Sequence, residues 1–134
     1  MSIKKEINLT ALKQFFEEEK NIMFVILFGS YAKKKQNKNS DIDLAIYLNI
    51  KDKIQRAKKR NIFIAKLLHI LNKKIDLVIL NDIQDNFLLH DILKEGKLIY
   101  CCNKEIFFDF KINRHHQVLD FLSHYYYVNS RKNY

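Results

Sequence analysis

Apolar residues in the first part of the chain change from helical to strand-like spacing. Up to about Lys20 they recur every three or four residues, which predicts a helix that Asn8 or Thr10 can cap. Residues 22–28, IMFVILF, then form a short continuous run rich in β-branched and aromatic side chains, typical of a strand buried on both faces. The chain is therefore expected to open with a helix packed on one face and a buried strand.

Two further apolar runs, over residues 41–48 and 75–80, predict a second and a third strand. Between them, Asp52 can begin a helix of about 20 residues with one apolar stripe and a largely basic, solvated remainder. The stripe comprises Ile54, Ala57, Ile64, Ala65, Leu68 and Leu71, and the basic residues include Lys53, Arg56, Lys59, Arg60 and Lys66. A helix of this length permits the two strands to be parallel neighbours.

The rest of the chain continues the alternation of helices and strands. We expect a helix over about 82–95 that ends at Gly96 as a C-cap, a short strand KLIYC over 97–101, and a final helix over about 104–129. This order predicts an α/β (α+β) fold with a small, mixed β-sheet flanked by helices. No linker or repeat is visible, so the 134 residues are expected to form a single domain with its core over 22–80.

Composition narrows the class of protein without naming a function. The longest apolar run is far shorter than the roughly 20 residues of a membrane span, and the N-terminus lacks the apolar stretch of a signal peptide, so we expect a cytoplasmic protein. The cysteines, Cys101 and Cys102, are adjacent and do not suggest a disulfide framework. The net charge of +9 suits a polyphosphate or an acidic protein, but lysine is abundant throughout, so direct nucleic-acid binding is not expected.

Three aspartates lie at the starts of two predicted strands. Asp41 and Asp43 are two residues apart and project from the same face, while Asp76 occupies the equivalent place in the third strand. Parallel strands would bring the three carboxylates together, and like charges about 5 Å apart repel by roughly 3 kcal/mol at an effective dielectric of 20. A divalent cation reverses that sign, and Mg²⁺ held by carboxylates serves phosphoryl or nucleotidyl transfer.

The Gly29-Ser30 pair follows the first strand directly. Gly29 allows the backbone to approach a ligand closely, and Ser30 can begin a short helix that offers a hydroxyl and free N–H groups to an anion. For this turn to face the aspartates, the first two strands must be antiparallel, which makes the sheet mixed. Each of these residues alone has a plain structural explanation, as a turn, a strand start or an ion pair with a lysine. Their joint spacing is what points to a site.

With these residues the sequence resembles the polymerase-β-type nucleotidyltransferase superfamily. The signature of that superfamily is Gly-Ser, about ten residues, Asp-x-Asp and a third Asp on a later strand, matched here by Gly29-Ser30, Asp41, Asp43 and Asp76. The whole chain is similar to the minimal nucleotidyltransferase (MNT) antitoxins that work beside HEPN-domain toxins. One departure is that Lys33-Lys34 stands where the family often has Arg-Gly, and a lysine contacts phosphate as a point charge instead of a fork.

The resemblance implies roles for the matched residues. Asp41 and Asp43 would bind two Mg²⁺ ions, Asp76 would hold the catalytic ion and help to activate the incoming hydroxyl, and Gly29, Ser30 and Lys33 would hold the outer phosphates of ATP. The implied activity is protein adenylyltransferase, also called AMPylation, with AMP passing from ATP to a tyrosine hydroxyl of a HEPN ribonuclease toxin. The modification would neutralise the toxin, and the two proteins could form a hetero-oligomer.

Alternatives remain open at this point. The chain could instead transfer a nucleotide to a small molecule such as an aminoglycoside, or neutralise a toxin by binding alone. The histidines of the last predicted helix, His115, His116 and His124, do not complete a tetrahedral zinc set, and they do not fit the Arg-x(4–6)-His spacing of HEPN ribonucleases. The apolar surface of that helix either closes the open face of the sheet or binds a partner or a second copy.

Overall fold

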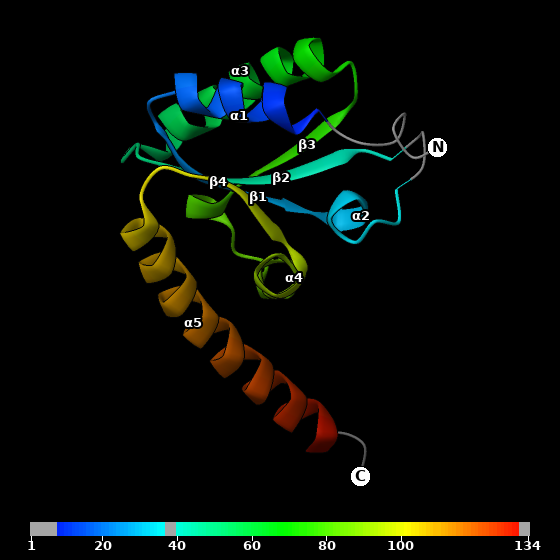
Figure 1. Cartoon of the computed structure of the whole chain (residues 1–134). Helices are drawn as coiled ribbons and strands as arrows, with labels where there is room; N and C mark the ends of the chain where they lie inside the picture. The colour runs from blue at the N-terminus through cyan, green and yellow to red at the C-terminus, as the bar shows by residue number, and fades with distance from the viewer. Residues whose placement is uncertain (1–7, 37–39, 132–134) are drawn as a thin grey trace.

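The computed structural model describes residues 8–36 and 40–131. The elements in chain order are α1 (Leu9–Glu18), β1 (Ile22–Phe28), α2 (Gly29–Ala32), β2 (Ile42–Leu48), α3 (Lys53–Leu71), β3 (Ile75–Ile79), the 3₁₀ turn η2 (Leu80–Asp82), α4 (Asn86–Glu95), β4 (Lys97–Cys101) and α5 (Lys104–Arg131). Figure 1 shows them as two layers of helices with a sheet between. No helix in the described ranges is long and apolar enough to cross a membrane.

The sheet has four strands in the order β3-β2-β1-β4. β1 pairs antiparallel with β2 and with β4, whereas β2 and β3 are parallel neighbours joined by α3. The predicted mixed sheet is therefore confirmed. The antiparallel pairing brings the end of β1 to the start of β2, with Phe28 opposite Asp43.

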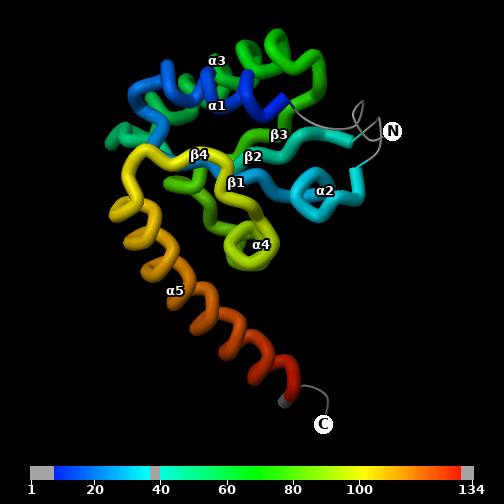
Figure 2. The backbone as a smooth tube through the Cα atoms, viewed as in Figure 1, coloured from blue at the N-terminus to red at the C-terminus, as the bar shows by residue number. Residues whose placement is uncertain are grey.

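Helices cover both faces of the sheet. α1 and α3 lie on one side and α4 and α5 on the other, as the tube in Figure 2 also shows. Alternate residues of the strands enter the two core clusters: Leu44 and Leu77 pack with α1 and α3, while Phe24 and Ala45 pack with α4 and α5. β1 is buried along its whole length, as its continuous apolar run predicts.

Local side-chain hydrogen bonds decide where several helices begin. Asn8, not Thr10, caps α1, because its side chain accepts a hydrogen bond from the N–H of Ala11. The prediction that a helix begins at about Asp82 was wrong by several residues. Asp82 ends the 3₁₀ turn, and Asp85 caps α4 by accepting hydrogen bonds from the N–H groups of Phe87 and Leu88.

The apolar stripe predicted for α3 is also displaced. Phe63 and Leu67 are fully buried, whereas Ile54 is 65% and Leu68 49% exposed. The prediction placed the basic residues of this helix largely on a solvated face. Arg60, however, donates from Nε to the carbonyl oxygen of Leu77 in β3, so a basic residue lies against the sheet. The fully buried residues, Phe63 and Leu67, are ones that the predicted stripe left out.

The long helix α5 has two different parts. Phe110 and Val118 are buried in the core cluster on the α4 side of the sheet, so this part closes that face, as one of the two interpretations expected. Toward its C-terminal end α5 extends away from the sheet (Figure 1), and Tyr126 and Tyr127 are 63% and 59% exposed.

Candidate active site

Asp43 and Asp76 lie side by side on adjacent strands. The parallel pairing of β2 with β3 places Asp43 directly opposite Asp76, with Ile42 opposite Ile75. Since side chains alternate along a strand, both carboxylates project from the face that carries α4 and α5, while Ile42 and Leu44 are buried on the other face. The two carboxylates that the sequence placed on different strands are therefore neighbours.

This arrangement disfavours the charged form of Asp43. Its pKa is raised from the ordinary value of 3.8 to about 6, first by burial and then by the charge of Asp76, a hydrogen bond with Asp76 and the charge of Asp41. Asp76 is exposed to solvent at the edge of the sheet. The pair therefore holds negative charge at an electrostatic cost, which a bound cation would remove.

The raised pKa predicts how stability depends on pH. Because the folded chain holds the proton of Asp43 more tightly than the unfolded chain, this group favours folding below pH 3.8, and that contribution is lost as the pH rises to about 6. Without divalent cations, the Asp43→Asn variant should therefore be more stable than the wild-type chain above pH 6. The difference should shrink as the pH falls toward 4, measured by urea unfolding of both proteins across this range. A difference that is independent of pH would contradict the prediction.

Asp41 is less closely engaged with the other two carboxylates. It precedes the first residue of β2, and its Oδ2 lies 4.0 Å from Nζ of Lys74. Within residues 8–36 and 40–131, no three or more His, Cys, Asp and Glu side chains are arranged closely enough to hold a metal ion. The expected convergence of three carboxylates is thus realised for Asp43 and Asp76, while Asp41 is directed in part to a lysine.

Gly29 is required by the backbone and by Asp43 together. Its φ is +72°, a conformation that L side chains rarely adopt. A Cβ at this position would overlap Oδ2 of Asp43 and would lie 2.9 Å from its Cγ. The turn that follows β1 thus packs directly against the carboxylate, and Ser30, half-buried, is the second residue of the short helix α2.

The two lysines that depart from the family motif follow α2. Nζ of Lys33 lies 3.2 Å from Oδ1 of Asp91, so this side chain is directed toward α4. Lys34 has a φ of +57°, the left-handed conformation for which glycine is suited. The glycine that the family resemblance led us to expect at this position would adopt this conformation without the penalty that the Cβ of a lysine brings.

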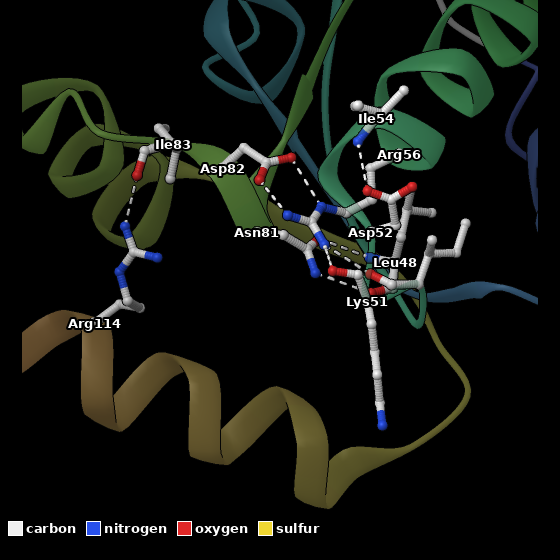
Figure 3. Close-up of polar contacts among 10 residues, drawn as sticks. Leu48, Lys51, Asp52, Ile54, Arg56, Asn81, Asp82, Ile83 and Arg114 are labelled. Carbon is white, nitrogen blue, oxygen red and sulfur yellow. Dashed lines mark hydrogen bonds and ion pairs between the residues drawn. The ribbon is translucent and has the colours of Figure 1, made fainter.

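Sequence reasoning missed a group of polar contacts at the far end of β2 and β3, drawn in Figure 3. Arg56 of α3 donates from Nε and Nη2 to Asp82 at 2.9 and 2.5 Å, and Asn81 bonds to the N–H and the carbonyl of Leu48. The hydrogen bonds between Arg56 and Asp82 raise the pKa of Arg56 and lower that of Asp82. A cavity of about 510 Å³ separates them from Arg114 of α5. No local signal could reveal these partners, because Arg56 and Asp82 are 26 residues apart.

Chains from several solved toxin–antitoxin structures share the fold of this chain. A chain in the crystal structure of a toxin–antitoxin with AMP-PNP superposes with a TM-score of 0.75 at 21% identity, over 96% of this chain and 100% of that chain. A chain in the complex of a tri-AMPylated Shewanella oneidensis HEPN toxin with MNT antitoxin gives 0.69 at 19% identity, over 95% and 97%. A chain of the MntA–HepT toxin–antitoxin gives 0.66 at 19% identity, over 93% and 95%. At these identities the likeness shows a shared fold.

Sequence comparison identifies the family. No curated protein sequence matches the chain. Residues 10–105 match the family described as "Polymerase beta, Nucleotidyltransferase", and this range includes β1 with its Gly-Ser turn and the strands that carry Asp43 and Asp76. Because the match spans well over half of the 134 residues, the chain belongs to the polymerase beta nucleotidyltransferase family.

Proposed function

We propose that this protein is a Mg²⁺-dependent protein adenylyltransferase that neutralises a HEPN ribonuclease toxin by transferring AMP from ATP to a tyrosine hydroxyl. The observation that carries the proposal is the placement of Asp43 beside Asp76 and against the Gly29 turn. Family membership supports nucleotidyl transfer. The fold shared with chains from toxin–antitoxin crystal structures, one containing AMP-PNP and one an AMPylated HEPN toxin, supports the nucleotide and the partner.

The carboxylates suit a magnesium ion. Asp43 and Asp76, joined by Asp41, would supply the oxygen ligands that Mg²⁺ prefers. The raised pKa of Asp43 fits this role, because burial and the neighbouring carboxylates disfavour its charged form, which a bound cation would favour. When bound, Mg²⁺ would neutralise charge on the phosphates and on the oxygens of an in-line displacement.

Other residues would bind the phosphates of ATP and orient the acceptor hydroxyl. The N–H groups of the Gly29-Ser30 turn and the Ser30 hydroxyl would hold the outer phosphates, and Lys33 would add a positive charge after release from Asp91. The acceptor oxygen would form a bond to the α-phosphorus of ATP as the bond to the pyrophosphate oxygen breaks. Asp76, which is exposed, would orient the acceptor hydroxyl and pass its proton to solvent.

A direct test is transfer of label to the partner. With ATP labelled at the α-phosphate and Mg²⁺, we expect a HEPN toxin co-expressed with the chain to become labelled on tyrosine, in a bond that phosphodiesterase cleaves. ATP labelled at the γ-phosphate should leave the toxin unlabelled, which separates AMP transfer from phosphorylation.

Two outcomes would replace the proposal with one of its alternatives. If the chain neutralises the toxin but transfers no label to it, neutralisation occurs by binding alone. If label passes instead to an aminoglycoside or another small hydroxyl compound, the acceptor is a small molecule. Binding alone is the stronger of the two alternatives, because no three carboxylates in the described ranges are arranged closely enough to hold a metal ion.

A further inference from the structure

An apolar stripe runs along the outer side of α5, the helix that extends away from the sheet (Figure 1). Its members recur at intervals of four, three, four, three and four residues: Phe108, Ile112, His115, Leu119, Leu122 and Tyr126. At 100° per residue they lie within about 40° of one line along the helix. Phe108, Ile112 and Tyr126 are 53%, 56% and 63% exposed, and Leu119 is 46% exposed. We call these six residues the α5 stripe.

The α5 stripe is separate from the side of the helix that joins the core. Phe110 and Val118, which are buried in the core cluster, lie about 120° around the helix from the stripe. The remaining side is polar and exposed, and it carries Asp109, Asn113, His116, Gln117, Asp120 and His124. Since the rest of the solvent-facing helix is polar, the open stripe indicates a surface for another molecule.

The spacing of the stripe identifies an α-helix as the occupant. Alternating steps of four and three residues average 3.5, the repeat that keeps two helices in contact along their length. The 18 residues from Phe108 to Tyr126 rise by about 27 Å, so contact of this kind would extend over several turns. A compact ligand would instead need its apolar contacts gathered at one level of the helix.

The stripe is symmetric about its own midpoint. Its intervals read the same from either end, with an aromatic ring at both ends and an aliphatic side chain next to each. Two antiparallel copies of α5 would therefore place Phe108 of one copy opposite Tyr126 of the other, and Ile112 opposite Leu122. A two-fold interface requires a surface that matches itself when reversed, and the α5 stripe meets this requirement.

Charge also favours a second copy at this position. The whole chain has a formal net charge of +9, so two copies repel each other over most of their surface. Residues 108–126 contain two acidic residues, Asp109 and Asp120, and two basic residues, Lys111 and Arg114, which gives a formal charge of zero with histidine neutral. The stripe thus lies on a neutral segment of a strongly basic protein.

The area of the stripe suits a reversible dimer. Covering the exposed half of a large apolar side chain removes roughly 100 Å² from water, so the four exposed apolar residues give about 400 Å² per copy and about 800 Å² per pair. His115, Leu122 and the residues that flank the stripe add to this, toward the ~1,200 Å² at which stable interfaces begin. Association at micromolar concentrations is therefore expected.

We propose that the α5 stripe is the interface of a two-fold homodimer in which the α5 helices of two copies pack antiparallel. The dimer goes beyond the proposed function, because it concerns a surface outside the carboxylate site. The sequence left open whether the apolar surface of this helix closes the sheet or binds a partner or a second copy. In the structure the side with Phe110 and Val118 closes the sheet, and the stripe remains for the second copy.

Sedimentation equilibrium of the full chain provides the test. The wild-type chain should dimerise with a Kd on the order of 10 µM. Ile112→Glu should raise the Kd at least about a hundredfold, because the two-fold places an unpaired carboxylate twice in an apolar layer. His115→Leu should lower the Kd about tenfold, since it makes the centre of the stripe apolar.

Gln117→Glu is the matched control. It adds the same charge as Ile112→Glu at an exposed position on the polar side of α5, so its Kd should stay within about threefold of the wild-type value. Ile112 is more than half exposed in the single chain, so both variants should keep the free energy of unfolding of the monomer. Urea unfolding at concentrations below the Kd measures this.

Disulfide formation reports the orientation of the two helices. In a chain with Cys101→Ser and Cys102→Ser, Phe108→Cys or Tyr126→Cys provides a single thiol at one end of the stripe. A mixture of these two variants should form the mixed disulfide. Phe108→Cys alone should not cross-link, because its two thiols lie about 27 Å apart along an antiparallel dimer. Ready cross-linking of Phe108→Cys with itself would show parallel helices and overturn the proposed arrangement.

Other results would overturn the interface itself. A wild-type chain that stays monomeric at about tenfold above the expected Kd has no such dimer. A dimer that persists in Ile112→Glu uses another surface. If the chain is monomeric and Ile112→Glu, but not Gln117→Glu, loses co-purification with the toxin, the stripe binds a helix of a different protein. These measurements do not use AMP transfer, so the proposed function is tested separately.

Discussion

An Asp43→Asn variant is expected to transfer AMP at least about a thousandfold more slowly than the wild-type chain, a loss of about 4 kcal/mol of transition-state stabilisation. Asp43 pairs in register with Asp76 and contacts the Gly29 turn, so it lies at the centre of the proposed metal and phosphate sites. The amide keeps the shape of the side chain but removes the negative charge that would hold Mg²⁺. Single-turnover transfer of label from α-labelled ATP, at saturating nucleotide, measures the effect.

The matched control is Asp120→Asn, which makes the same chemical change at an exposed aspartate of α5. This variant should transfer AMP at the wild-type rate. Mg²⁺ should raise the melting temperature of the wild-type chain and of Asp120→Asn but not that of Asp43→Asn. If Asp43→Asn kept more than about a tenth of the wild-type rate with an unchanged Mg²⁺ dependence, Asp43 would not be a metal ligand.

A Gly29→Ala variant is expected to lose both stability and activity. The φ of +72° alone costs a residue with a Cβ about 1–2 kcal/mol, and the new methyl group overlaps Oδ2 of Asp43, so the carboxylate must move away from its place beside Asp76. We expect the free energy of unfolding to fall by about 2 kcal/mol or more and AMP transfer to be nearly abolished. Urea unfolding and the α-labelled ATP assay measure the two effects.

A double-mutant cycle separates the two causes. In an Asp43→Ala background the carboxylate is absent, so Gly29→Ala should cost only the conformational part, and the loss of stability should be smaller than in the wild-type background. An equal loss in both backgrounds would show that backbone conformation alone requires the glycine. A neutral Gly29→Ala would contradict the observed geometry of the turn.

Much of the sheet could be predicted from local pattern. The continuous apolar run over residues 22–28 is strand β1, and the mixed sheet follows from the need for its end to face Asp41 and Asp43. The third predicted strand is shorter than expected, because β3 ends at Ile79 and Leu80 begins a 3₁₀ turn. That boundary depends on contacts of the turn with other elements, such as those of Asp82 with Arg56. These two residues are 26 positions apart, so a local sequence pattern does not reveal the contact.

The errors have a common physical cause. The prediction for α3 treated its basic residues as a solvated surface, whereas Arg56 and Arg60 bond to Asp82 and to the carbonyl of Leu77. The prediction for the following helix took Asp82 as its start, whereas Asp82 is engaged by Arg56 and Asp85 supplies the cap. In each case a charged side chain found a partner distant in sequence.

The sequence by itself determined which residues can act together within one element, because spacing along a strand sets the face that each side chain occupies. It thereby identified Asp41, Asp43 and Asp76 and the Gly29-Ser30 turn as a candidate site for nucleotidyl transfer. Only the tertiary structure decided how these residues meet. Packing places Asp43 opposite Asp76 and the Gly29 turn against Asp43, since both contacts join residues of different elements.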